Sequence, residues 1–92
     1  MNTTIWKFVL RPGESHNSPS VVKMPDGAKI LSVQAQGSEV CMWAEVDPTH
    51  AETPYEFWIV GTGRELPAKR GTFLGTFQMD WMVFHVYRAL EG

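Results

Sequence analysis

The sequence has few of the residues that staple small secreted domains or mark membrane spans. Its 92 residues include one cysteine, Cys41, so no internal disulfide can form and the framework of a small secreted module is excluded. No run approaches the roughly 20 apolar residues that a membrane span needs, and residues 1–10 lack the basic and apolar segments of a signal peptide. We therefore expect a protein of a reducing cytoplasm that does not enter a membrane.

Charge of one sign is also scarce. The formal net charge is -2 and 20% of the residues are charged, which leaves no basic field for duplex nucleic acid. The hydrophobic fraction of 43% is too high for a disordered chain. At this length the core is small, so we expect a single β domain over residues 1–92 that gains buried surface by forming a homo-oligomer.

Short apolar runs alternate with Pro, Gly, Asn and Asp along the whole chain, a pattern typical of strands joined by turns. It predicts an all-β fold, a small single-domain antiparallel β-sandwich or barrel of about six or seven strands. The expected strands are residues 4–10, 20–24, 28–36, 39–47, 55–60, 72–79 and 82–88. The run 81–90 also fits a helical stripe, but its Val, Phe, Tyr and Trp content favours a strand.

The segments between these runs are predicted to be loops. Residues 14–20 are polar and form the expected long loop of the first half of the chain, with flexibility, whereas 47–54 is expected to be an exposed connection that carries His50. Residues 65–71 suit a surface loop. Gly75 interrupts its strand, which indicates a bulge or a close approach by a ligand or another backbone.

Seven short motifs are spread over nearly the whole chain. They are Ile5-Trp6-Lys7, Met24-Pro25-Asp26-Gly27-Ala28, Ile30-Leu31-Ser32-Val33-Gln34, Trp43-Ala44, Val60-Gly61-Thr62-Gly63, Gly75-Thr76-Phe77-Gln78 and Val83-Phe84-His85-Val86. In this order they resemble those of a family of small uncharacterised proteins encoded by tailed phages and prophages. The chain departs from that family in its longer polar segment between Arg11 and Ser20. The resemblance implies a small phage protein of the host cell cytoplasm, a class that includes agents against host defence, and it carries over no catalytic residues.

The turn Gly61-Thr62-Gly63-Arg64 follows a predicted strand and has two interpretations. It is an ordinary glycine turn, or it presents backbone N–H donors with a hydroxyl and a guanidinium to an anion such as a phosphate. It is not a Walker loop, because no Lys-Ser/Thr pair follows at the required spacing, and no Rossmann glycine set precedes a helix.

The other reactive side chains do not assemble into a known motif. The three histidines are far apart and Cys41 is alone, so no metal site is predicted. A nucleophilic pair of Cys41 with His85 is conceivable, although a cysteine in a strand is more typical of core packing. Glu45 and Asp47 share a strand face, which suits an acid/base pair or simply a solvated surface. His85 is expected at a core edge or interface, or as a ligand donor paired with Thr76 or Gln78.

Four tryptophans are many for so short a chain. Trp43 and Trp58 fall on strand faces that also carry glutamates. Such aromatic surfaces beside Arg64 could stack a nucleobase while the glycine turn holds a phosphate. Burial in an oligomer interface, where Trp is enriched, is the alternative, and both hold if a pocket forms between subunits.

The sequence therefore predicts a non-catalytic binding protein that needs no cofactor. Its expected ligand is a small anionic, nucleotide-like molecule, such as a host immune signal, which the protein sequesters as an anti-defence agent. The candidate ligand-binding residues are Gly61, Thr62, Gly63, Arg64, Trp43, Trp58, Gln78 and His85. The alternative is a phage interaction protein, either a minor virion or assembly component or an inhibitor that docks on a host protein. An enzyme is not expected, since no nucleophile, base and orienting group can be assembled from the spacing.

Overall fold

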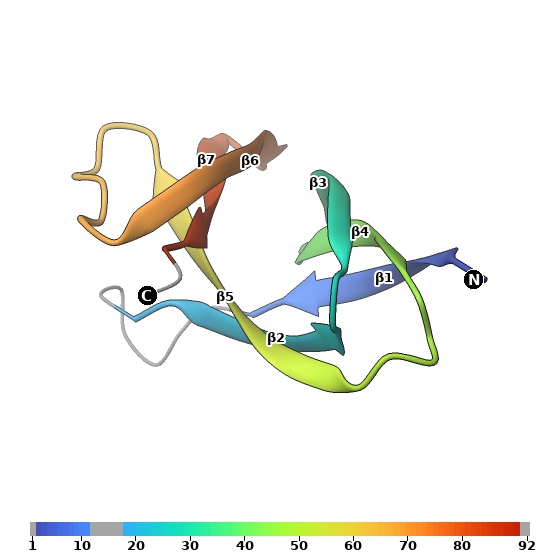
Figure 1. The fold of residues 1–92 in the computed structure, drawn as a ribbon. Coiled ribbons are helices and arrows are strands. Elements are labelled where there is room, and N and C mark those ends of the chain that lie inside the picture. Colours follow the sequence, from blue (N-terminus) through green and yellow to red (C-terminus); the bar gives the residue numbers. More distant parts are fainter. Residues whose placement is uncertain (1, 12–17, 91–92) are drawn as a thin grey trace.

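The chain forms two antiparallel β-sheets. The computed structural model describes residues 2–11 and 18–90, which contain seven strands and no helix, as the sequence predicts (Figure 1). The strands are β1 (Thr4–Leu10), β2 (Ser20–Pro25), β3 (Lys29–Gln36), β4 (Glu39–Val46), β5 (Glu52–Gly61), β6 (Arg70–Met79) and β7 (Met82–Ala89). No helix in the described ranges has the length and apolar character that crossing a membrane requires.

The strands divide into a three-stranded and a four-stranded sheet. Sheet A has the order β1-β4-β3, and sheet B has the order β2-β5-β7-β6. Two tight hairpins, β3 to β4 and β6 to β7, join neighbours within a sheet, whereas β2 and β5 pair across the intervening strands of sheet A. The sheets approach one another most closely where β3 lies against β6, and β1 approaches β2 on the other side.

Alternation along the strands directs one face of each sheet into a shared core. In β4, Met42, Ala44 and Val46 are buried against sheet B, while Trp43 and Glu45 occupy the outer face. The buried cluster comprises Leu10, Met24, Val33, Met42, Ala44, Val46, Tyr55, Phe57, Phe77 and Val86. Cys41 is fully buried although its position belongs to the outer face of sheet A, so it packs as a small apolar group.

Gly75 brings the two sheets together. The ladder between β6 and β7 changes register on either side of Phe73, and a Cβ on Gly75 would lie 3.6 Å from the Val33 Cβ and 3.9 Å from its backbone nitrogen. Both features expected of a glycine within a strand, a bulge and a close backbone approach, are therefore present. A second bulge displaces Leu31 between Ile30 and Ser32 of β3.

Several boundaries differ from the prediction. The expected connection 47–54 is wrong in its second half, because Glu52, Thr53 and Pro54 pair with β2 as the beginning of β5. The expected loop 65–71 ends earlier, since Arg70 and Gly71 already belong to β6. The final run is a strand and not a helix. The loop predicted at 14–20 lies mostly outside the described residues, which resume at Ser18.

One end of the sandwich is closed by hydrogen bonds between the turn 25–28 and the loop 47–51. The Asp26 N–H donates to the Ala51 carbonyl at 2.8 Å, and the His50 Nδ1–H donates to the Asp26 carbonyl at 2.8 Å. The Gly27 N–H donates to the Tyr55 hydroxyl at 3.0 Å. We call this region, with Tyr55, the closed end.

Asp47 organises the loop at the closed end. Its Oδ1 accepts the Thr49 hydroxyl at 2.6 Å and the Thr49 N–H at 2.9 Å, and its Oδ2 lies 3.5 Å from the His50 Nε2. The hydroxyl and the N–H of Thr49, helped by the His50 charge and opposed by desolvation, hold the pKa of the Asp47 carboxyl below its ordinary value of 3.8. Asp47 is buried, so the predicted solvated pair with the exposed Glu45 is not what the structure forms.

Candidate functional site

His85 is held between two threonine hydroxyls on the outer face of sheet B. Its Nε2 lies 2.8 Å from the Thr62 Oγ1, in the turn after β5, and its Nδ1 lies 2.9 Å from the Thr76 Oγ1 of β6. The register explains the second contact, because Thr76 is the cross-strand neighbour of His85. Of the two predicted partners of His85, Thr76 is therefore confirmed, while the Gln78 side-chain amide donates instead to the Asp80 carbonyl at 3.2 Å.

The donor and acceptor roles around His85 depend on its tautomer. When the Thr62 hydroxyl donates to the Val83 carbonyl at 3.2 Å, it accepts from the His85 Nε2–H, and Nδ1 then accepts from the Thr76 hydroxyl. In the other tautomer the Thr62 hydroxyl donates to Nε2 and the Nδ1–H donates to the Thr76 hydroxyl. Both ring nitrogens have a threonine partner in either case, which leaves neither of them for a ligand.

The Gly61-Thr62-Gly63-Arg64 turn uses two of its amides internally. The Thr62 N–H donates to the Val83 carbonyl at 3.0 Å, and the Arg64 N–H donates to the Gly61 carbonyl at 3.1 Å. Gly63 has φ of 90°, in the left-handed region that favours glycine. A phosphate cradle built on all four amides would require these bonds to break, so the backbone of this turn favours the structural interpretation.

The Arg64 side chain lies near the inner surface of the sandwich. A Cβ at Gly61 would be 3.6 Å from the Arg64 Cγ and 3.8 Å from the Phe84 ring, so the Arg64 stem and that ring flank the same point. Because Gly61 has no side chain, the Arg64 stem has room to lie across β5. The Arg64 guanidinium has no hydrogen bond or ion-pair partner in the part of the chain that the structure describes.

The two tryptophans of the predicted site are on different sheets. Trp43 lies on the outer face of sheet A, whereas Trp58 lies on the outer face of sheet B opposite Tyr87, so the structure does not bring them together. Phe73 is next to Tyr87, with ring centroids 5.4 Å apart, and it completes an aromatic row across three strands. The Trp58 Nε1 is buried without a hydrogen-bond partner among the described residues.

No catalytic or metal constellation forms within residues 2–11 and 18–90. Cys41 belongs to sheet A and His85 to the outer face of sheet B, so the conceivable nucleophile pair is not assembled. No group of three His, Cys, Asp or Glu side chains in these ranges is arranged to hold a metal ion.

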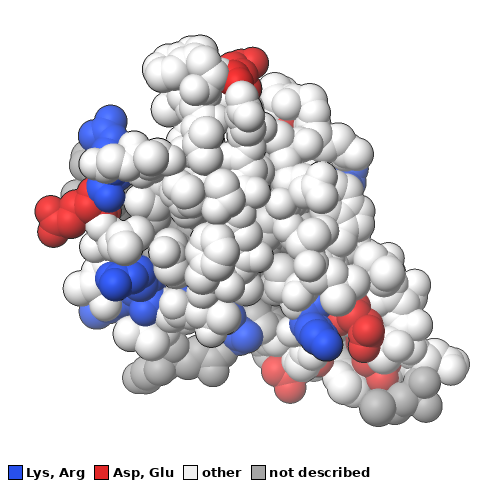
Figure 2. Space-filling model, turned by 90° about the horizontal axis from the view of Figure 1, so that it is seen from above, with Lys and Arg blue, Asp and Glu red and all other residues white. Residues whose placement is uncertain are grey.

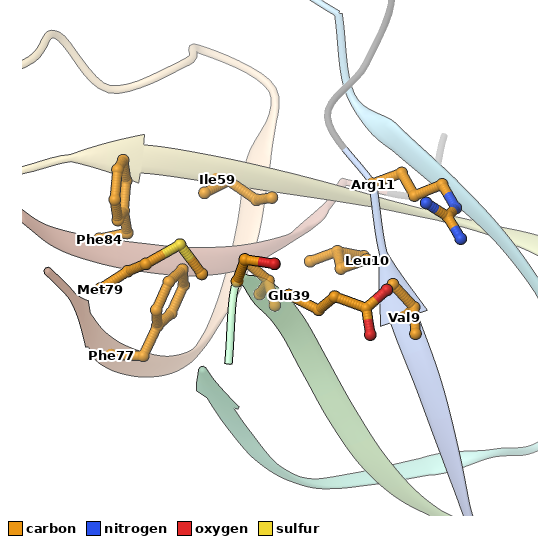
Figure 3. A pocket seen from close by; sticks show the side chains of 10 residues that line it. Val9, Leu10, Arg11, Glu39, Ile59, Phe77, Met79 and Phe84 are labelled. Atoms are coloured by element: carbon orange, nitrogen blue, oxygen red, sulfur yellow. The ribbon is translucent and has the colours of Figure 1, made fainter. Parts of the chain in front are cut away.

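A pocket that sequence reasoning missed lies between the two sheets at the end opposite the closed end (Figure 3). We call it the end pocket. Its volume is about 260 Å³, and its lining is Val9, Leu10, Arg11, Ser38, Glu39, Val40, Ile59, Phe77, Met79 and Phe84. Phe77, Met79 and Phe84 lie on one side, and Val9 and Leu10 face them from β1.

The walls of the end pocket are apolar and its rim is charged. The Phe77 and Phe84 rings are stacked, with centroids 5.4 Å apart and an angle of 22° between their planes. Arg11 and Glu39 are exposed and bring one charge of each sign to the rim (Figure 3). Neither side chain has a hydrogen-bond or ion-pair partner in the described ranges.

The end pocket was missed because its lining comes from five strands, the turn before β4 and Arg11 after β1. In the sequence the apolar lining residues look like ordinary core positions of their strands. Arg11, directly after the first strand, and Glu39, directly after a glycine turn, were the available signals, since both are charges at strand ends that share one end of the molecule. Chemically, the pocket suits a ring-sized apolar group that carries polar or charged substituents.

Comparison with known proteins gives a family but no activity. Residues 1–91 match the model of a family described as a domain of unknown function (DUF7352). No curated protein and no solved structure matches the chain.

Proposed function

The chain belongs to the DUF7352 family, whose description assigns no activity, and we propose that it is a non-catalytic protein that binds a small anionic, nucleotide-like ligand. The observation that carries this proposal is an apolar cavity of about 260 Å³ that opens between the sheets and is lined in part by Arg11, whose guanidinium has no partner among the described residues. The body of the ligand occupies the end pocket, and its anionic group contacts the rim.

The walls favour one planar ring system. Drug-sized ligands occupy pockets of about 300–1,000 Å³, so a cavity just below that range accepts a single ring-sized group. The stacked Phe77 and Phe84 rings and the Met79 thioether offer aromatic and polarisable contacts to such a ring. A nucleobase has the required size and shape.

The rim favours a nucleotide over a fatty acid. A guanidinium binds phosphate through paired N–H donors, and Arg11 supplies one at the rim. Arg64 is not part of the lining, but its stem lies near Phe84, which is. Glu39 accepts hydrogen bonds from the amino groups of a base, which a fatty acid does not offer. A ligand with both N–H donors and a phosphate satisfies the two signs of charge at the rim.

The remaining lining groups support binding without turnover. Apart from Arg11, Ser38 and Glu39, every lining side chain is hydrocarbon or thioether. Together with the resemblance to tailed-phage proteins, this supports sequestration in the host cell cytoplasm, where removal of a nucleotide signal would blunt a host defence.

Calorimetry with a panel of cyclic and linear nucleotides tests the proposal. We expect one nucleotide class to bind, with about tenfold or greater loss of affinity in Arg11→Ala and a smaller loss in Arg64→Ala. Lys23→Ala is the matched control, since Lys23 is an exposed cation on β2 that does not line the end pocket. Heat denaturation of the complex should release the ligand intact. Failure of every nucleotide to bind, or consumption of the ligand in molar excess, would overturn the proposal.

The outer face of sheet B favours a second candidate, an interaction protein. Phe73 and Val21 are 51% and 59% exposed there, and residues 71–87 contain Asp80 but no lysine or arginine. In the view of Figure 2, which looks down on Figure 1 from above, the charged side chains lie toward the margins of the visible surface. This candidate predicts that a stoichiometric host or virion protein is recovered with the wild-type chain and with Arg11→Ala, but not with Phe73→Glu. Recovery with the wild type and with both variants would exclude this face.

A further inference from the structure

Strand β1 has one edge that no other strand covers. It pairs with β4 alone, and no backbone hydrogen bond joins it to another strand in the described part of the chain. Its first four residues are all exposed, with Ile5 at 58% and Trp6 at 38%. Figure 1 shows β1 reaching the periphery of the molecule at its N-terminal end. The open edge therefore presents unpaired backbone groups beside two large apolar side chains.

The usual protections of an edge strand are missing from β1. Its seven residues contain no proline, and its pairing with β4 has no bulge. Lys7 is its only charged residue, but the Lys7 ammonium donates to the Gln36 Oε1 at 2.9 Å. Gln36 belongs to β3, on the far side of β4, so the lysine charge is turned back over sheet A and away from the open edge.

We infer that the open edge of β1 pairs with β1 of a second copy of this chain. An exposed strand edge is completed by another extended strand, and a two-fold axis lets the same segment serve both partners. Antiparallel pairing of the two β1 strands joins two three-stranded sheets into one continuous six-stranded sheet. This pairing does not depend on the proposed ligand, because the residues at its centre, Ile5, Trp6 and Lys7, do not line the end pocket.

The face alternation restricts the register. Directly opposed residues share a face in an antiparallel pair. The two-fold axis must therefore lie between the two copies of one residue of the exposed segment, which face each other across it. An axis at Lys7 would place the two positively charged Lys7 residues opposite each other. An axis at Ile5 would leave Trp6 opposite Thr4 of the partner subunit. Only an axis at Trp6 pairs the two indole rings, which cross-strand energetics favour.

The Trp6 register also separates the charges. It places Ile5 opposite Lys7 of the partner subunit, so an apolar side chain lies along an aliphatic stem and no like charges meet. Thr4 then opposes Phe8 of the partner subunit. The sequence of β1 is thus complementary to itself in this one register.

Sedimentation and light scattering over a range of concentrations test the pairing. We expect a concentration-dependent dimer in the wild-type chain. Ile5→Lys should weaken it about tenfold or more, because two like charges then meet on each side of the axis, whereas Ile5→Glu should preserve or tighten it. The two substitutions are matched, since both place a charge at the same exposed position. Adding Lys7→Glu to Ile5→Lys should restore the dimer.

Each other outcome overturns the inference. A monomer mass at every concentration up to about 1 mM would show that the dimer does not form. Equal weakening of the dimer by both Ile5 substitutions would contradict the Trp6 register. A dimer whose affinity neither substitution changes would show that the interface does not involve β1. Oxidation of Trp6→Cys should give an intersubunit disulfide, with Lys29→Cys on β3 as the control, because native Cys41 is fully buried. Equal cross-linking of both variants would contradict the pairing.

Discussion

The two ends of the sandwich are completed by different chemistry. At the closed end, backbone N–H groups of Asp26 and Gly27 are satisfied by Ala51 and by the Tyr55 hydroxyl, and Asp47 ties the adjoining loop together. At the other end, apolar side chains line an open cavity, and Arg11 and Glu39 have no partner among the described residues.

The difference separates stability from binding. Asp47 and Tyr55 are buried at the closed end and their oxygen atoms are hydrogen-bonded, so removing one partner of such a bond costs free energy of unfolding. Arg11 and Glu39 at the end pocket are exposed and have no partner in the described ranges, so their removal should cost little stability. The side chains that are still able to bind a ligand therefore lie at the end pocket, and substitutions there should change affinity more than stability.

The largest expected effect is loss of binding when the end pocket is filled. Met79→Trp places an indole between the sheets, and we expect the affinity for the bound nucleotide to fall about 100-fold or more while the melting temperature is unchanged or higher. Calorimetry and thermal unfolding on the same sample measure both. Undiminished binding in this variant would place the ligand elsewhere.

The next effect concerns stability at the closed end. Tyr55→Phe keeps the ring, which lies 4.7 Å below the Arg88 guanidinium, but it leaves the Gly27 N–H without its acceptor. We expect a loss of about 1–2 kcal/mol in denaturant unfolding with unchanged affinity. Tyr87→Phe is the control, because the Tyr87 hydroxyl has no hydrogen bond to a described residue. An equal loss in both variants would show that the hydroxyl contact contributes nothing specific.

A smaller effect is expected in the hairpin beside the end pocket. Asp80 has φ of 56°, the left-handed region that aspartate tolerates better than alanine. Asp80→Ala should therefore cost about 1 kcal/mol, while Asp80→Gly should be neutral or slightly stabilising. Chemical denaturation of the pair measures the difference. Equal stability of the two would mean that the turn relaxes without strain.

The smallest effect is a change in the acid response of the closed end. Folding lowers the pKa of Asp47, so its carboxylate stabilises the fold fully above its ordinary value of 3.8 and loses this contribution as the pH falls through the lower folded pKa. Asp47→Asn keeps an acceptor for Thr49 but does not titrate. Its unfolding free energy should decline less steeply below pH 3.8 than that of the wild type. Parallel curves would assign acid sensitivity to other carboxyls.

The sequence predicted every strand because turn residues and alternation are local signals. It missed the start of β5, where Pro54 argued for a loop. The structure tolerates Pro54 since β7 pairs only with Phe57–Gly61, so at Pro54 the strand has a free side that needs no N–H donor. The burial of Asp47 could not be predicted from the sequence either, because its partners are side-chain and backbone groups whose positions depend on the loop conformation.

The candidate site was predicted only in part. Cross-strand spacing was enough to place Thr76 beside His85. Alternation shows which face of a strand a residue occupies but not which sheet the strand joins, so Trp43 and Trp58 were grouped although they lie on different sheets. The end pocket depends on the separation of two sheets, and no local pattern encodes that separation.

Methyl NMR during a nucleotide titration tests the central claim most directly. The account predicts that the Met79, Ile59 and Val40 methyl signals at the end pocket shift, while those of Met24 and Val46 in the core away from it stay in place. Shifts confined to Met24 and Val46 or to the outer face of sheet B, or no shifts with any nucleotide, would contradict it.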